Sequence, residues 1–250
     1  MNETIQTLHS LRSIHGNFSE QAIRDEDLQV ILNASVRAAN ASARQSYSIV
    51  VVDDRDLMKQ LCGYAGSKLL VFCVDYNRLL AMAEYLGHPY TAEGIVSFVT
   101  GSTDTILAAQ TAVIAAKSLG IDSLLTNGIH RGDMNRVYEL LDLPKKGCFP
   151  LIALVLGYPT HEPDFHKGRL TGAGVIHYGK YQPVTEEAMD TLIEQYDDPE
   201  VHLALNYAWK DKDFAHYLDW FFEVWSGRGG TPPGKSQMFE LLEQAGFMKF

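Results

Sequence analysis

Cysteine is scarce in this chain, which has three cysteines in 250 residues and no C-x-x-C pair. The odd number argues against a disulfide framework and is typical of a reduced, cytoplasmic protein. Cys73 lies inside an apolar run, so we expect it in the core. The first residues lack the apolar run of a signal peptide, and no stretch is long and apolar enough to span a bilayer. We therefore expect no membrane segment.

Several motifs that carry catalysis are also missing. The nine histidines form no H-E-x-x-H pattern and no paired Cys/His spacing, so we expect no metal site. There is no Walker A motif and no G-x-S-x-G. The two Gly-x-Gly sequences at 172–174 and 227–229 lack the strand-turn-helix context of a dinucleotide fingerprint. No pair of acids stands out for general acid–base work, so we name no catalytic side chain.

Positive charge is in deficit, with 21 Lys and Arg against 31 Asp and Glu and a net charge of −10. This balance argues against nucleic acid or an anionic membrane as the main partner. A ligand that carries a phosphate would need local cations to hold it against that field. The length fits one large domain, or a core with an appendage.

Apolar runs and helical spacing predict both strands and helices. We expect strands at 47–52, 69–74, 123–126 and 151–156, and helices at 25–39, 102–119 and 134–141, after Thr185, over 214–225 and near the C-terminus. Ser102, Thr103 and Asp104 look like the cap of the second helix. The mixed segment 79–101 is a candidate mobile cover, 227–234 a linker, and 246–250 a possible edge strand.

The strand at 151–156 is an unbroken apolar run, which is typical of a strand buried on both faces. A polar loop follows it and carries Lys167 and Arg169. An Arg fork and a mobile Lys charge at the exit of a sheet are well placed to grip a phosphate. The alternative is a solvated basic turn, because surface charges usually have no ligand.

The segment 214–225 places six large apolar side chains at helical spacing, five of them aromatic. It lies beyond the part of the chain that we expect to complete a core. We expect this aromatic face to take part in a subunit interface.

Four stretches together resemble the FMN-dependent nitroreductase/flavin reductase family, in the branch of the NADPH-dependent major nitroreductase and flavin reductase P. They are LRSIHGNFSEQAI near the start, VRAANASARQSYSIVVVDD, VFCVDYNR followed by AAQTAVIAAKSLGI, and ELLDLP with PLIALVLGYP, KGRL and VIHYGKYQP. Their order and spacing match over roughly residues 8–183, and the tail matches loosely.

The resemblance implies an α+β fold, a three-layer α/β/α arrangement with a mixed sheet flanked by helices and an intertwined homodimer. It implies FMN as cofactor and NAD(P)H as co-substrate. We expect an FMN-binding core over 1–180 and a C-terminal extension over 181–250 that packs on the core and on the dimer partner.

The resemblance also implies the site. Its residues are Arg12, Ser13, Lys167 and Arg169 for the phosphate and ribityl chain, Asn40, Ala41 and Ser42 contributed by the partner, Gln45 as a further cofactor-binding residue, and Thr126, Asn127, Gly128 and Ile129 facing the ring. His15 stands where the family usually carries a basic residue, beside the flavin N1 and O2.

The implied activity takes hydride from NAD(P)H onto FMN N5 and passes electrons by ping-pong to a nitroaromatic, a quinone or free flavin. Two alternatives stay open. The protein could be a flavin-binding carrier or sensor without turnover, or a specialised reductase of the same family.

Overall fold

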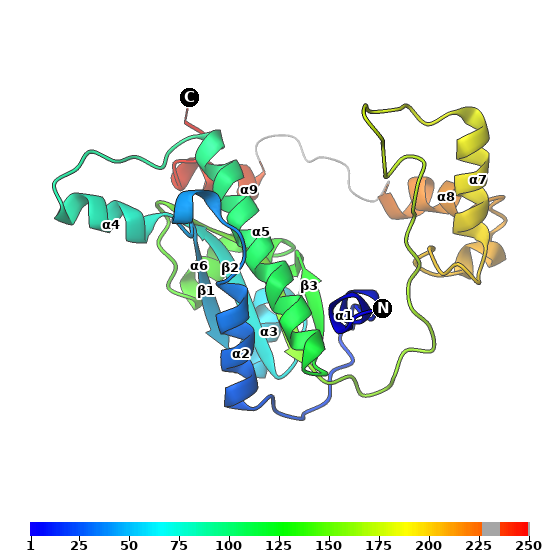
Figure 1. Cartoon of the computed structure of the whole chain (residues 1–250), viewed down its shortest axis with the longest axis horizontal. Coiled ribbons are helices and arrows are strands. Elements are labelled where there is room, and N and C mark those ends of the chain that lie inside the picture. Colours follow the sequence, from blue (N-terminus) through cyan, green and yellow to red (C-terminus); the bar gives the residue numbers. More distant parts are fainter. Residues whose placement is uncertain (227–235, 250) are drawn as a thin grey trace. The chain divides into compact units, whose positions relative to one another are not determined.

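The computed structural model describes residues 1–226 and 236–249 (Figure 1). They fall into two compact units. The first holds residues 1–162 and the described C-terminal residues, and the second begins at Pro163. The linker predicted at 227–234 lies outside the described residues. The division into a core over 1–180 and an extension over 181–250 stays a prediction.

The first unit is built on a four-stranded sheet. Its strands are β1 (Tyr47–Val52), β2 (Lys68–Asp75), β3 (Asp122–Thr126) and β4 (Cys148–Gly157), in the order β1-β2-β4-β3. The three strand pairs are antiparallel, and an isolated parallel bridge joins Ser13 to Ser123. All four strands predicted from apolar runs are confirmed, because β-branched and leucine-rich runs suit a pleated, buried surface.

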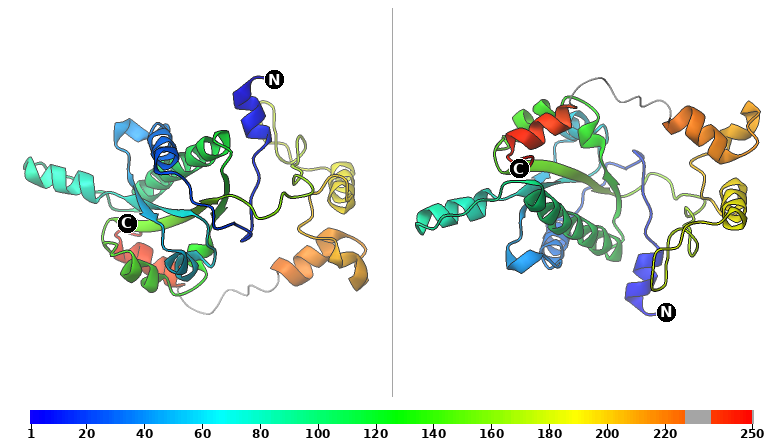
Figure 2. Two further views of the ribbon diagram at one scale, coloured as in Figure 1. Left: turned by 90° about the horizontal axis from the view of Figure 1, so that it is seen from below. Right: turned by 90° about the horizontal axis from the view of Figure 1, so that it is seen from above.

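Helices cover both faces of this sheet (Figure 2). The pairs are α2 (Asp25–Ser35) with α5 (Ile95–Ser118) on one face, and α3 (Arg55–Cys62) with α6 (Met134–Leu140) on the other. Neighbouring residues of β2 alternate between the two cores: Leu70 packs with the α5 side and Val71 with the α3 side. The predicted three-layer α+β fold is confirmed. The sheet was expected to be mixed, and its parallel part among the described residues is the isolated bridge at Ser13, since the three strand ladders are antiparallel.

Helix α5 begins seven residues earlier than the sequence predicts, so the expected cap at 102–104 is wrong. Thr103 and Thr105 donate their hydroxyls to the carbonyls of Val99 and Gly101, which lets these polar residues lie inside a helix.

The segment before α5 holds α4 (Asn77–Tyr85) and a loop that project from the sheet (Figure 1). Its role as a mobile cover stays a prediction.

Two further helices complete the first unit. Helix α1 (Glu3–His9) opens the chain, and α9 (Gln237–Gln244) returns to the core. The edge strand proposed for 246–250 is wrong for the described residues. Gly246 has φ +88°, the chain turns there, and Phe247 is fully buried against Phe98 and Tyr76.

The second unit has its own small core. Helix α7 (Glu186–Asp197) begins at the predicted cap Thr185, and the aromatic segment forms α8 (Tyr217–Trp220) and a π-helical turn (Phe221–Trp225). Tyr217 and Trp220 are buried with Trp209 inside this unit, so most of the aromatic face is internal core. Phe222 and Trp225 are the exposed remainder, and the part of this face in a subunit interface stays a prediction.

A membrane-crossing helix is absent from the described residues, none of whose helices is both long and apolar enough.

Candidate functional site

The segment around Ser13 runs alongside β3. Ile14 donates its backbone N–H to the Ser123 carbonyl at 3.0 Å, and Ser13 forms the parallel bridge with Ser123. This pairing places Arg12 beside Asp122, the first residue of β3. The predicted Arg12-Ser13 pair is therefore fixed to the sheet rather than held in a free loop.

The Arg12 guanidinium is shared between two carboxylates. Its Nε and Nη2 donate to Oδ1 and Oδ2 of Asp122 at 3.1 and 2.5 Å, and Nη1 donates to Oε2 of Glu162 at 2.6 Å. Lys117 also donates to Oδ1 of Asp122, at 2.7 Å. Burial opposes ionisation of Asp122, but the hydrogen bonds from Arg12 and Lys117 outweigh it and lower the pKa of that carboxyl. Asp122 is thus a buried, ionised anchor.

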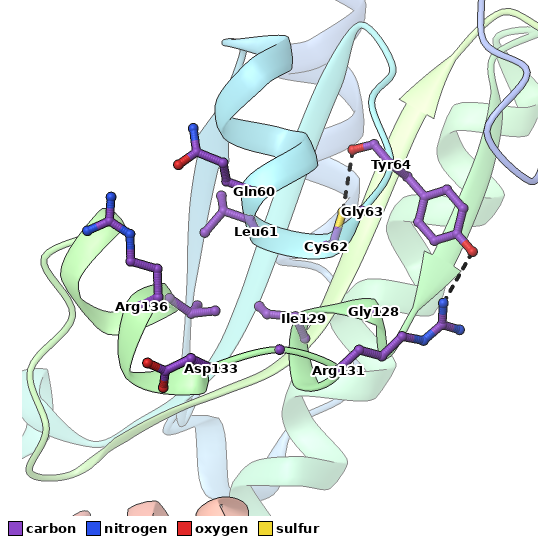
Figure 3. A pocket seen from close by; sticks show the side chains of 12 residues that line it. Gln60, Leu61, Cys62, Gly63, Tyr64, Gly128, Ile129, Arg131, Asp133 and Arg136 are labelled. Carbon is purple, nitrogen blue, oxygen red and sulfur yellow. Dashed lines mark hydrogen bonds between the residues drawn. The ribbon is translucent and has the colours of Figure 1, made fainter. Parts of the chain in front are cut away.

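A pocket of about 520 Å³ lies where the C-terminal end of α3 meets η2 (Gly128–His130) and the start of α6 (Figure 3). Apolar and polar side chains both line it, among them Leu61, Ile129 and Val137, and Gln60, Tyr64, Arg131, Asp133 and Arg136. Its size falls in the range of small-molecule and cofactor sites.

Gly128 allows one wall of this pocket to form. A Cβ at Gly128 would lie 2.3 Å from the Cys62 carbonyl oxygen, so only glycine permits this approach of η2 to the end of α3. Thr126 fixes the turn from β3, because its hydroxyl accepts the Gly128 N–H at 3.0 Å. Gly128 and Ile129 are buried, whereas Asn127 is exposed.

Tyr64 and Arg131 face one another at the pocket (Figure 3). The Arg131 guanidinium donates to the Tyr64 hydroxyl at 3.4 Å, and no ion pair of Arg131 occurs among the described residues. The ring of predicted His15 packs edge-on against Tyr64, with centroids 6.4 Å apart. His15 therefore contacts Tyr64, which lines the same pocket as Gly128 and Ile129.

His130 follows these residues and is held away from the pocket by the core. Its Nε2 lies 2.9 Å from the Pro150 carbonyl oxygen, and burial lowers its pKa below the usual value of 6.5. The ring is therefore neutral at pH 7 and donates from Nε2, which makes it a structural histidine.

The predicted loop residues Asn40, Ala41, Ser42 and Gln45 form a tight turn around η1 (Ala41–Ala43). Ser42, Ala43 and Gln45 all have positive φ, near +50°. Buried Asp104 on α5 holds the loop by accepting the N–H groups of Ala41 and Ser46 at 2.8 and 3.2 Å. The backbone conformation is unusual for non-glycine residues, and the carboxylate offsets part of its cost.

Lys167 and Arg169 lie in the second unit, in a loop bound to the segment 201–205. Lys167 donates its ammonium to the Ala204 carbonyl oxygen. Arg169 donates Nη1 to the carbonyls of Lys167 and Gly168 at 3.2 and 2.8 Å. A Cβ at Gly168 would meet the Val201 carbonyl oxygen at 2.0 Å, so this glycine is required for the approach. The guanidinium has no carboxylate partner among the described residues.

Comparison with known proteins decides the family. The model of the nitroreductase family matches residues 10–158, more than half of the chain. The chain belongs to the nitroreductase family.

Two curated relatives match most of this family member. An oxygen-insensitive NADPH nitroreductase of Salmonella typhimurium (strain LT2) is 33% identical over 207 residues, covering 79% of this chain and 81% of its own. An NAD(P)H FMN reductase of Bacillus subtilis (strain 168) is 31% identical over 209 residues, with the same two coverages.

Two solved structures agree with the fold. B. megaterium NfrA2 superposes with a TM-score of 0.79 at 30% identity, and each chain covers all of the other. The NADPH:FMN oxidoreductase of Vibrio harveyi, in complex with NAD⁺, superposes with a TM-score of 0.77 at 26% identity, again over both whole chains.

Within this chain, the structure places eleven of the predicted site residues in the first unit and two, Lys167 and Arg169, in the second. Sequence patterns did not indicate Tyr64, Arg131 or Asp122 as parts of the site. A carboxylate that opens a buried strand was the available signal for Asp122, since a buried acid requires partners. Among the described residues no cluster of His, Cys, Asp and Glu could hold a metal ion.

Proposed function

We propose that this protein is an FMN-dependent NAD(P)H oxidoreductase that reduces nitroaromatics, quinones or free flavin by ping-pong turnover. One observation carries the proposal: a pocket in the first unit joins the predicted ring-facing backbone at Gly128 and Ile129 to polar and cationic groups, in a chain of the nitroreductase family. The names of the two curated relatives, an NADPH nitroreductase and an FMN reductase, support the same chemistry.

The residues at the pocket fit a flavin. Apolar Leu61 and Ile129 suit a planar ring, and the close approach at Gly128 presents backbone where a side chain would otherwise stand. Tyr64 and Arg131 offer a hydroxyl and a cation for polar ring atoms. When bound, FMN supplies the atom that accepts hydride, and the chain supplies orientation and positive charge. His15 is proposed beside N1 and O2.

The phosphate and ribityl chain are assigned to the cations and to Ser13. Arg12 and Ser13 are fixed beside β3, and Arg12 keeps one guanidinium nitrogen for a partner other than Asp122. Lys167 and Arg169 are proposed as further phosphate ligands, supported by the resemblance and by the lack of a carboxylate partner for Arg169 among the described residues.

A homodimer is proposed, with Asn40, Ala41 and Ser42 given to the partner's flavin and Gln45 as a further cofactor-binding residue. The support is an apolar face of α5 that stays exposed in the single chain, at Ile95, Val96, Val99, Ile106 and Leu107. The loop at 40–46 is held to α5 through Asp104, and its assignment to the partner's flavin is supported by the resemblance. A cytoplasmic location is proposed from three buried, unpaired cysteines.

The visible spectrum of the purified protein tests the proposed function. We expect a yellow protein with about one FMN per subunit, which NADPH bleaches under anaerobic conditions and an added quinone reoxidises. A colourless protein that cannot be reconstituted with FMN contradicts the proposal. Bound FMN without turnover for any acceptor would instead favour the carrier or sensor, and product analysis distinguishes a specialised reductase.

A further inference from the structure

Four charged groups meet at the end of β3: the cations Arg12 and Lys117 and the carboxylates Asp122 and Glu162. The two carboxylates differ sharply in environment. The Asp122 side chain is 3% exposed, whereas that of Glu162 is 77% exposed. Asp122 is therefore buried at the start of β3, whereas Glu162 reaches Arg12 from the solvent-exposed side.

Asp122 fixes the direction of the Arg12 guanidinium. It accepts from Nε and Nη2 in a fork, which leaves Nη1 as the end that points to Glu162. Lys117 binds the same carboxylate, so Asp122 has two cationic partners. Arg12, Lys117 and Asp122 together carry one net positive charge, which Glu162 balances.

The contact between Arg12 and Glu162 is replaceable. An ion pair with an exposed carboxylate contributes little in water, because solvent screens it and a long side chain must be ordered to make it. A phosphate dianion offers more acceptor oxygens and more charge to the same nitrogen than one carboxylate does. Among the described residues, Arg12 is the one side chain from which the Glu162 carboxylate accepts a hydrogen bond.

We propose that Asp122 positions the Arg12 guanidinium for the phosphate of FMN, and that the Glu162 carboxylate competes with that phosphate for Arg12 Nη1. This inference rests on the proposed function. Asp122 is a positioning residue, and Glu162 sets how tightly the cofactor is held. The affinity for FMN is then lower than the cations alone would give.

Flavin titration of the full-length protein stripped of cofactor tests this assignment. Quenching of flavin fluorescence gives the dissociation constants of FMN and of riboflavin, which lacks the phosphate. Glu162→Gln should tighten FMN binding about two- to fivefold, the range of an exposed ion pair, and leave riboflavin binding unchanged. Glu26→Gln, an exposed change of the same charge on α2, is the matched control.

Asp122→Asn should act in the opposite direction, by weakening FMN binding more than riboflavin binding. The ratio of the two affinities separates lost positioning of Arg12 from a general loss of structure, which would weaken both. If Glu162→Gln matches Glu26→Gln, or tightens FMN and riboflavin equally, the inference is overturned while the proposed function stands. If the wild-type protein binds no FMN, the proposed function fails as well.

Discussion

Gly128 shows how a single residue can shape the pocket. Its Cα lies so close to the end of α3 that an added methyl group would stand 2.3 Å from the Cys62 carbonyl oxygen. The atom that the methyl group would meet is a backbone oxygen and not the end of a flexible side chain. The strain is therefore relieved only by a shift of η2 away from the end of α3.

Gly128→Ala should therefore destabilise the fold by about 1–3 kcal/mol, the usual cost of overpacking, and should weaken FMN binding. Urea unfolding and flavin titration measure the two effects. Gly132→Ala is the matched control for stability, because a Cβ there meets nothing within 4 Å. Equal stability of the two variants would show that η2 shifts without cost.

Substitution of Arg169 tests whether its guanidinium binds the FMN phosphate. If it bonds the FMN phosphate, Arg169→Ala should cost about 1.5–3 kcal/mol, or roughly a 10- to 150-fold loss of FMN affinity. Arg169→Lys should restore part of it, because an ammonium lacks the bidentate fork. Enzyme re-saturated with FMN should keep most of its turnover rate, since the phosphate is remote from the ring. Unchanged affinity in Arg169→Ala would favour a solvated basic turn.

At the scale of elements, α5 does more than cover the sheet. Its buried Asp104 holds the loop at 40–46 in a conformation with three positive φ angles. That loop precedes β1 and carries four of the predicted site residues. The helix therefore sets the backbone geometry of a candidate binding loop.

Asp104→Asn should loosen this loop. An amide keeps one acceptor oxygen and turns an NH₂ group toward the second N–H, at a cost of about 1–3 kcal/mol for the unsatisfied donor. Hydrogen exchange should speed up at the Ala41 and Ser46 amides and stay unchanged in β4. Asp190→Asn, an exposed position on α7, is the control. Protection at Ala41 and Ser46 equal to wild type would refute the role of Asp104.

The strands were predictable and the buried polar contacts were not, for a physical reason. A continuous apolar run such as 151–156 can be recognised from the local sequence alone, because a strand buried on both faces needs an apolar residue at each position. The polar triplet at Ser102 looked like a helix cap, since the same residue types serve caps and hydroxyl-to-carbonyl bonds inside helices. The contact from Arg12 to Asp122 spans 110 residues, and no local pattern records such a partner.

At the scale of the whole molecule, the exposed apolar face of α5 predicts association. Val99→Glu would place a charge in the middle of this face, whose burial in a dimer should not tolerate an unpaired carboxylate. We expect a dimer for the wild type and a shift to monomer for this variant in light scattering at micromolar concentration. Val175→Glu, similarly exposed but in the second unit, should stay dimeric. A wild-type monomer with FMN bound would contradict the proposed dimer.

The return of α9 to the first unit has a consequence for how the protein is made. Leu241, Ala245 and Phe247 are buried beside Tyr76 and Phe149, although the whole second unit lies between them in the chain. During synthesis from the N-terminus, the ribosome must release the second unit before it delivers these three residues. Until then Tyr76 and Phe149 have a solvent-facing side, so a nascent chain arrested after the second unit should bind holdase chaperones that the finished chain does not.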